Sequence, residues 1–307
     1  MPTKIDSLAI PFKDFMRGVN EHNESTTSRA NRSVDSLGNS RENFWSKFLP
    51  NFQRHHASFV LPENNLPALY QRLGELPSLS AAISVKELGR VEDLPIHVIH
   101  MKAKNSRAKK NVLVCAGVHG NEPSSVSAVF ELIKKIELSP ALRENVNFYI
   151  LPCINPHGYK AVSRRNQNDV DLNRAFAMDG QVNEPEISLI KPFFKKTSFD
   201  LVLDLHSALP KRNGYFVLHR SDLNLLEPAM QQFSKKWPVL SNGSKPYTEQ
   251  APGICTSSPK GTLKDYLADR GCEHVVTLEA PRALPFVERS KGLGELAWSI
   301  IKEFSTT

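Results

Sequence analysis

The sequence has no apolar run long enough to cross a membrane. Its 307 residues are 40% hydrophobic and 23% charged. No stretch approaches the roughly 20 apolar residues that a membrane-spanning helix needs. The first fifteen residues carry several charges and lack the apolar segment of a secretory signal peptide. These absences predict a protein without a membrane partner and with a cytoplasmic location.

Cysteine is scarce, and a basic stripe typical of nucleic-acid binding is missing. The cysteines at 115, 153, 255 and 272 form no Cys-x-x-Cys pair, so we expect free thiols. The net charge of +7 is spread along the chain, apart from a cluster in Lys102–Lys110 that is typical of a solvated connection between strands. We therefore predict no nucleic-acid partner, whereas an acidic small substrate suits the charge. Nothing in the sequence indicates an oligomeric state.

Apolar runs and helical patterns alternate along most of the chain. Strands are predicted at 112–116, 146–151, 201–205 and 275–278, of which the first, third and fourth are of the buried type, with further strands at 84–88, 94–101 and 215–218. Helices are predicted at 66–76, at about 124–136 with Ser124 or Ser125 as the cap, and at 184–194, 261–270 and 294–304. This alternation is typical of the α/β class, with a mixed, mostly parallel twisted sheet covered by helices on both faces.

A polar segment precedes this part of the chain. Residues 19–41 are dominated by Asn, Ser, Thr, Glu and Arg and contain almost nothing to bury, as expected of a linker or long loop. We therefore predict an N-terminal extension, residues 1–82, of unassigned role, followed by a catalytic domain, residues 83–307.

Polar residues follow the three predicted strands of the buried type. His119 and Glu122 follow the first, His206 follows the third and Glu279 follows the last. Because the carboxyl ends of parallel strands meet at one edge of a sheet, these side chains can converge there. Taken alone, His119 and Glu122 would be interpreted as a surface pair, and His206 as a hydrogen-bonded histidine at the end of a strand. Two histidines and one glutamate form the ligand set of a catalytic zinc, with a fourth position left for water.

The convergence predicts one zinc ion per chain, held by His119, Glu122 and His206. The further carboxylate of Glu279 then suits a general base that accepts a proton from water. A second polar stretch, Ser163–Arg174, would on its own be read as an exposed loop. Next to a zinc site, its guanidinium groups could stabilise an oxyanion and hold a substrate carboxylate through a bidentate pair.

Together these motifs resemble the zinc metallocarboxypeptidases of the carboxypeptidase A type, over roughly residues 83–307. Within that family the text His119-Gly-Asn-Glu-Pro-Ser-Ser is most similar to the bacterial murein peptide amidases. The matching motifs are His119-Gly-Asn-Glu122, Asn155-Pro-His-Gly-Tyr159, Arg164-x-Asn166, Asp171-Leu-Asn-Arg174, Glu184-Pro-Glu186, Asp204-Leu-His206 and Thr277-Leu-Glu279.

The resemblance implies a role for each matched residue. It makes His119, Glu122 and His206 the zinc ligands and Glu279 the general base. It makes Arg164 the oxyanion-stabilising arginine, with the adjacent Arg165 as a substrate-binding residue and the other candidate for that role. It also implies that Asn173 and Arg174 bind the terminal carboxylate of the substrate. The family's pocket tyrosine has no direct counterpart, and Tyr247 is the nearest one upstream of Gly261-Thr262.

The resemblance implies a zinc-dependent carboxypeptidase or amidase that hydrolyses a small peptide with a free carboxylate. A murein peptide with a γ-D-glutamyl–diaminopimelate bond is one candidate substrate. The alternative is an N-acyl amino acid deacylase of the succinylglutamate desuccinylase/aspartoacylase type, which shares three of the motifs. Glu184-Pro-Glu186 and Arg164-x-Asn166 favour the peptidase. A binding protein on an inactive scaffold is disfavoured, because it would have no need of Glu279.

Overall fold

The computed structural model describes residues 60–105, 110–176, 184–207, 212–241, 247–256 and 261–306. The predicted polar linker at 19–41 and the middle of the basic cluster, residues 106–109, lie outside this range. Among the described residues no helix is long and apolar enough to cross a membrane. All four cysteines are free, as predicted.

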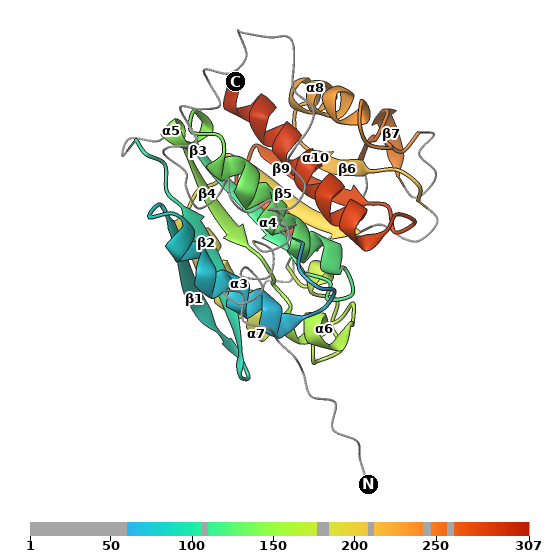
Figure 1. Ribbon diagram of the computed structural model, residues 1–307. Helices are drawn as coiled ribbons and strands as arrows, with labels where there is room; N and C mark the ends of the chain where they lie inside the picture. Colours follow the sequence, from blue (N-terminus) through green and yellow to red (C-terminus); the bar gives the residue numbers. More distant parts are fainter. Residues whose placement is uncertain are drawn as a thin grey trace, which may run out of the picture. The chain divides into compact units, whose positions relative to one another are not determined.

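Among the described residues, a nine-stranded sheet forms the centre of the fold, in the order β1-β2-β4-β3-β5-β9-β6-β8-β7 (Figure 1). Its middle strands β4, β3, β5 and β9 are parallel neighbours, whereas β1, β2 and β6 join them through antiparallel pairs. The predicted α/β fold with a mixed sheet is confirmed. Among the described strands, four pairs are parallel and four are antiparallel, so the expected parallel pairing prevails only in the centre of the sheet. The strands are β1 (Ile83–Val91), β2 (Leu94–Met101), β3 (Lys110–Ala116), β4 (Val146–Leu151), β5 (Leu201–Ser207), β6 (Phe216–Arg220), β7 (Thr248–Ala251), β8 (Ile254–Thr256) and β9 (His274–Ala280).

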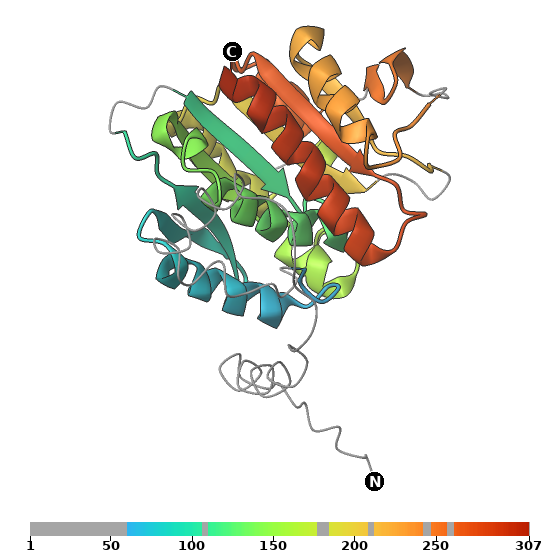
Figure 2. The same ribbon diagram turned by 45° about the horizontal axis from the view of Figure 1, so that its top comes forward.

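Helices cover both faces of the sheet. α4 and α10 lie side by side across one face (Figures 1 and 2). On the other face, Leu113 and Val202 of the sheet belong to a core that also contains Ile190 of α7 and Leu267 of α9. The helices are α3 (Leu66–Leu79), α4 (Pro123–Glu137), α5 (Leu142–Asn145), α6 (Pro156–Ala161), α7 (Pro185–Lys196), α8 (Leu223–Ser234), α9 (Leu263–Ala268) and α10 (Phe286–Thr306), with a 3₁₀ turn at Leu172–Arg174.

The C-terminal helix α10 begins at Phe286, eight residues before the predicted start at 294. Gly292 and Gly294 both have low intrinsic helix propensity. In the structure both lie inside the helix. A Cβ atom at Gly294 would lie 3.1 Å from the carbonyl oxygen of Ala128 in α4. The glycine therefore allows α10 to pack directly on the backbone of α4.

The predicted helix before residue 82 is confirmed as α3. Its residues Leu66, Leu69 and Leu73 are buried, and the Tyr70 hydroxyl donates a hydrogen bond to the carbonyl oxygen of Pro95 in β2, 3.2 Å away. The division of the chain at residue 82 stays a prediction, but α3 is itself packed against the strands that follow it.

The turn that follows β3 contacts the segment that follows β4 and leads into α6. Gly117, with φ of 63°, turns the chain out of β3, and its carbonyl oxygen accepts from the backbone N–H of Asn155 at 2.9 Å. A Cβ atom at Gly120 would lie only 1.9 Å from the carbonyl carbon of Gly158 in α6. Because that neighbour is backbone rather than a flexible side chain, residue 120 must be glycine.

Gly120→Ala should therefore destabilise the protein by about 3 kcal/mol or more, the upper end of what overpacking costs. The matched control is Gly74→Ala in α3, where a Cβ atom would meet nothing within 4 Å. In that helix interior the substitution should stabilise by about 0.5–1 kcal/mol. Urea unfolding of the three proteins checks both signs. A Gly120→Ala protein as stable as the wild type would contradict this packing.

Candidate active site

Helix α4 begins with Glu122 as its N-cap and Pro123 at its first position, so the predicted cap at Ser124 or Ser125 is wrong. The Glu122 side chain makes no capping hydrogen bond. Its carboxylate instead accepts from the backbone N–H of Ser207 at 2.8 Å, across from the end of β3 to the end of β5. The start of α4 thus directs a buried carboxylate into the edge of the sheet.

The predicted metal ligands His119, Glu122 and His206 come together at this edge. One ligand atom from each lies within 4.8 Å of the other two. Nδ1 of His119 lies 3.1 Å from Oε1 of Glu122, and Nδ1 of His206 lies 3.1 Å from Oε2. All three side chains are at most 3% exposed. Two imidazole nitrogens and a carboxylate therefore converge in a site that is shielded from water.

The other nitrogen of each histidine faces a second carboxylate. Nε2 of His119 lies 3.0 Å from Oδ1 of Asp171, and Nε2 of His206 lies 2.9 Å from Oδ2 of Asp204. Metal-binding histidines usually donate their second ring N–H to such a group, which fixes the tautomer. Nδ1 is then the nitrogen available to a metal on both rings. The sequence held a signal for Asp204, since residues two apart on a strand share a face.

The charged neighbours in this cluster shift the pKa of Glu122 and that of His206 in opposite directions. Burial alone would raise the pKa of Glu122, but attraction to His206 and hydrogen bonds with both histidines hold it well below its usual range. Burial alone would lower the pKa of His206, yet Asp204 and Glu122 raise it well above its usual value. A buried site with two imidazole ligands and the carboxylates of Glu122, Asp171 and Asp204 fits a divalent metal ion.

Glu279 stands directly beside His206. The two residues are paired in the parallel register of β5 and β9, and Glu279 lines the same cavity as the three predicted ligands. Burial raises the pKa of Glu279 to about 7, with repulsion from Glu122 adding to this and attraction to His206 opposing it. A carboxylate with this pKa can both accept and return a proton near neutral pH.

The cavity of about 280 Å³ also brings in the polar segment around residue 170. The Arg164 guanidinium donates to Oδ2 of Asp171 through Nε at 3.1 Å and through Nη2 at 2.9 Å. Its Nη1 lies 3.3 Å from Nδ1 of His119. Asn173 is buried and accepts from the backbone N–H of Leu263 at 2.9 Å.

The two other arginines of this segment differ in place. Arg174 is exposed at the cavity wall, where its Nη1 donates to the carbonyl oxygen of Asn173 at 2.7 Å. The Arg165 guanidinium is half exposed and donates to the carbonyl oxygen of Asp169 at 2.6 Å, and Arg165 does not line the cavity. Of the predicted site residues, Arg165 is the one that the structure does not bring to the others.

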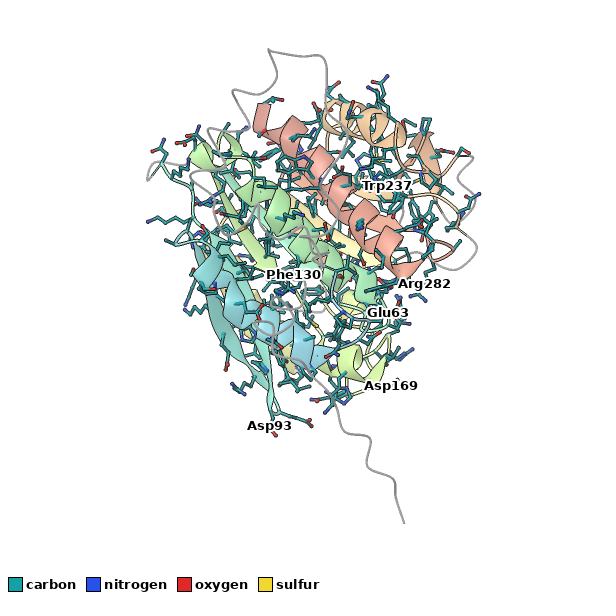
Figure 3. All side chains as sticks on the ribbon, in the orientation of Figure 1. Glu63, Asp93, Phe130, Asp169, Trp237 and Arg282 are labelled. Atoms are coloured by element: carbon teal, nitrogen blue, oxygen red, sulfur yellow. The ribbon has the colours of Figure 1, made fainter. Side chains whose placement is uncertain are left out.

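Two cationic residues of the cavity escaped the sequence analysis. Lys264 is 3% exposed and makes no hydrogen bond or ion pair within the described part of the chain. Burial lowers its pKa. Nη2 of Arg282 lies 3.5 Å from Oε1 of Glu122, and Figure 3 labels this arginine. Neither belongs to a matched motif, and only the fold distinguishes them from surface residues. Tyr247 also lines the cavity.

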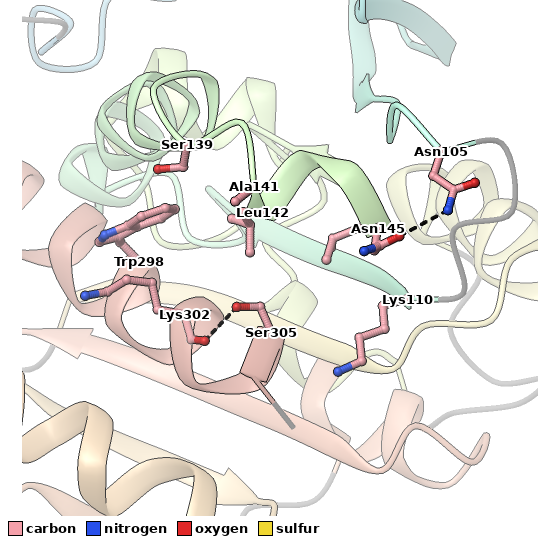
Figure 4. A pocket seen from close by; sticks show the side chains of 10 residues that line it. Asn105, Lys110, Ser139, Ala141, Leu142, Asn145, Trp298, Lys302 and Ser305 are labelled. Atoms are coloured by element: carbon pink, nitrogen blue, oxygen red, sulfur yellow. Dashed lines mark hydrogen bonds between the residues drawn. The ribbon is translucent and has the colours of Figure 1, made fainter. Parts of the chain in front are cut away.

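A larger cavity of about 720 Å³ lies beside the first residues of β3, away from these groups (Figure 4). Lys110, Trp298 and Lys302 are among its lining residues. The Lys110 ammonium already donates to the carbonyl oxygen of Phe304 at 3.0 Å. No His, Cys, Asp or Glu is among the described residues that line this cavity. The groups capable of chemistry collect in the smaller one.

Comparison with known proteins assigns the chain to a family. Residues 108–290 match the family model described as the succinylglutamate desuccinylase/aspartoacylase catalytic domain. The chain belongs to this family. Carboxypeptidase SOL1 of Arabidopsis thaliana is 29% identical over 132 residues, which cover 38% of this chain and 27% of that protein. Murein peptide amidase A of Escherichia coli is 38% identical over 69 residues, which cover 22% of this chain and 26% of that protein.

The chain thus aligns with only about a quarter of the length of these two relatives. A metallo-carboxypeptidase of Pseudomonas aeruginosa, solved in complex with (2-guanidinoethylmercapto)succinic acid, shares the fold with a TM-score of 0.62 at 19% identity. That similarity covers 77% of this chain and 67% of the other. The predicted family resemblance and the predicted metallocarboxypeptidase fold are confirmed. The matching family model is the one that the sequence analysis held as its alternative.

The raised pKa of Glu279 predicts a pH dependence of stability in the metal-free protein. Its folded pKa of about 7 lies above the ordinary 4.5. The folded state therefore binds a proton at Glu279 more tightly than the unfolded state does. The stability that this proton contributes is complete below about pH 4.5 and is lost as the pH rises through about 7. Between about pH 5 and 8 the free energy of unfolding of the wild type should fall relative to that of Glu279→Gln. Urea unfolding in the presence of a chelator measures this difference. An equal pH dependence in the two proteins would contradict the assignment.

Proposed function

We propose that this protein is a zinc-dependent hydrolase that cleaves the amide bond of a small substrate carrying a free carboxylate. The observation that supports this most is the convergence of His119, Glu122 and His206 in a cavity that also contains Glu279 and three arginines. One zinc ion per chain and a cytoplasmic location are part of the proposal.

The metal would be held by Nδ1 of His119, the carboxylate of Glu122 and Nδ1 of His206. When bound, a zinc ion polarises a carbonyl group and makes water more acidic. Asp171 and Asp204 hold the two rings in place from behind, through the Nε2 atoms. The protein thereby fixes the ligand geometry before a substrate arrives.

Glu279 would move the proton. Its carboxylate takes a proton from the water that attacks the carbonyl carbon and returns it to the nitrogen of the leaving amine. Burial raises the pKa of Glu279 and so makes its carboxylate a better proton acceptor. Its place beside His206 in the register of β5 and β9 sets it next to the metal ligands rather than among them.

Arg164 would stabilise the negative charge that develops on the carbonyl oxygen. Its two hydrogen bonds to Asp171 hold the guanidinium next to His119 without reorganisation during the reaction. Asn173 and Arg174 would bind the substrate carboxylate, with the planar guanidinium of Arg174 suited to a bidentate pair.

The cavity as a whole favours an acidic substrate of amino-acid or dipeptide size. Its lining has four cationic side chains, Arg164, Arg174, Lys264 and Arg282, against the carboxylates of Glu122 and Glu279. A volume of about 280 Å³ is at the small end for ligand sites. Lys264 and Arg282 are left over after the reacting groups are assigned, and they suit a second acidic group on the substrate.

Two substrate classes fit this description. A murein peptide with a γ-D-glutamyl–diaminopimelate bond is the leading candidate, supported by the 38% identity to murein peptide amidase A. An N-acyl acidic amino acid is the second candidate, and the desuccinylase/aspartoacylase family model favours it. Turnover of the purified zinc-loaded protein on both, side by side, separates them. If the protein cleaves neither substrate, the proposed function is wrong.

Glu279→Gln and His206→Ala should separate the chemical step from metal binding. We expect Glu279→Gln to retain one zinc and to lose activity by about 10²–10⁴-fold, because an amide cannot accept the proton. His206→Ala should lose both the metal and the activity, since a ligand is removed. Elemental analysis and kcat on the same preparations check this. Near-normal turnover in Glu279→Gln would mean that another group is the base.

Arg174 should report on recognition of the free carboxylate. We expect the wild type to prefer a substrate with a free terminus over its C-terminal amide, and Arg174→Ala to lose about tenfold or more of kcat/KM on the free acid alone. Arg174→Lys should not restore it, because an ammonium cannot form the bidentate pair. If the wild type cleaves acid and amide equally well, the site does not read a terminal carboxylate.

Lys264 should report on a second acidic group. Lys264→Met keeps the length of the side chain and removes its charge. We expect KM to rise about tenfold or more for a substrate with two carboxylates, and to change little for its analogue with one. An equal change in KM for both substrates would indicate that Lys264 supports the cavity without contacting the substrate.

A further inference from the structure

A side chain from outside the matched motifs contacts the turn that carries two of the predicted metal ligands. Nδ2 of Asn64 donates to the carbonyl oxygen of Gly120 at 2.7 Å and to the carbonyl oxygen of Tyr159 at 2.7 Å. Gly120 lies between His119 and Glu122 in the sequence. One amide group therefore ties the metal-binding turn to helix α6.

These two hydrogen bonds lie where the two backbones are already in contact. The space that a Cβ atom of Gly120 would need is taken by the backbone of Gly158 and Tyr159. With no side chain at residue 120, this part of the turn depends on its backbone contacts. The carbonyl groups of Gly120 and Tyr159 both face Asn64, which is half-buried. Without the Asn64 amide, the carbonyl oxygens of Gly120 and Tyr159 would face each other with no hydrogen-bond donor between them.

Asn64 is itself held in place. Three residues before it, the backbone N–H of Leu61 donates to the buried hydroxyl of Ser127 in α4, 2.8 Å away. Two residues after it, the side chain of Leu66 is 4% exposed at the start of α3. The backbone of Asn64 has φ of 48°, a left-handed conformation that Asn adopts more readily than most residues. The segment is thus anchored on both sides and turned so that the Asn64 amide meets the turn.

We infer that Asn64 is a positioning residue for the metal site: it orients the turn 119–122 so that His119 and Glu122 face His206. This inference rests on the proposed function, since it assumes a metal at these ligands. Groups that orient metal ligands from behind typically contribute about 10–100-fold in metal affinity. The inference also gives residues 60–65, which precede the region of family resemblance, a role in the active site.

Asn64→Asp and Asn64→Gly test it, with Asn65→Asp as the matched control. Asn64→Asp keeps the shape and removes both donors, and Asn64→Gly removes them without adding a charge and still accepts positive φ. At residue 65 the side chain is an acceptor, from the backbone N–H of Ala68 at 2.9 Å. Aspartate retains that role and adds the same charge one residue away. Zinc affinity is measured by competition with a chromogenic chelator, and the fold of each metal-free variant by circular dichroism.

We expect both Asn64 variants to be folded without metal and to bind zinc about 10–100-fold more weakly than the wild type. Asn65→Asp should bind as the wild type does. If the wild type binds one zinc and the Asn64 variants bind it equally tightly, the inference is wrong. It is equally wrong if Asn65→Asp loses as much affinity, or if the metal-free Asn64 variants are unfolded, which would show a general structural role. A wild type that binds no zinc overturns the proposed function itself.

Discussion

The buried carboxylate of Glu122 is the group on which the rest of the site depends. A charged carboxylate that is 3% exposed is costly unless partners are held against it. The fold supplies them from two parallel strands: His119 from the turn after β3, and His206 with the backbone N–H of Ser207 from β5. This requirement explains why Glu122 leaves the start of α4 uncapped, and why residue 120 is a glycine that lets the turn lie against α6.

Much of the fold could be predicted because the central strands are mostly buried and appear as apolar runs, each interrupted by at most one polar residue. The strands that begin near Val112, Val146, Leu201 and Val275 were all located in this way. Elements whose ends depend on tertiary contacts were less predictable. Helix α10 runs through two glycines, of which Gly294 faces the backbone of α4 and Gly292 faces Tyr215 and Trp237, and a local pattern contains neither contact.

The candidate site divides along the same line. His119, Glu122, His206 and Glu279 could be predicted to converge, since each follows a predicted strand. The observed β5 and β9 each extend two residues further, so His206 and Glu279 are their second-last residues. Arg282 and Lys264 could not, because nothing in their own neighbourhoods marks them and only the packing of α9 and the turn after β9 brings them in. Asn64 is more remote still, and its contact with Gly120 joins residues 56 positions apart.

A crystal structure of the zinc-loaded protein, with anomalous data collected at the zinc edge, is the decisive measurement for this metal site. One anomalous peak should lie about 2.0–2.2 Å from Nδ1 of His119, Nδ1 of His206 and a carboxylate oxygen of Glu122. Asp171 and Asp204 should stay hydrogen-bonded to the Nε2 atoms. A peak held by other residues, or a fully loaded protein with no peak between these three side chains, would contradict the account.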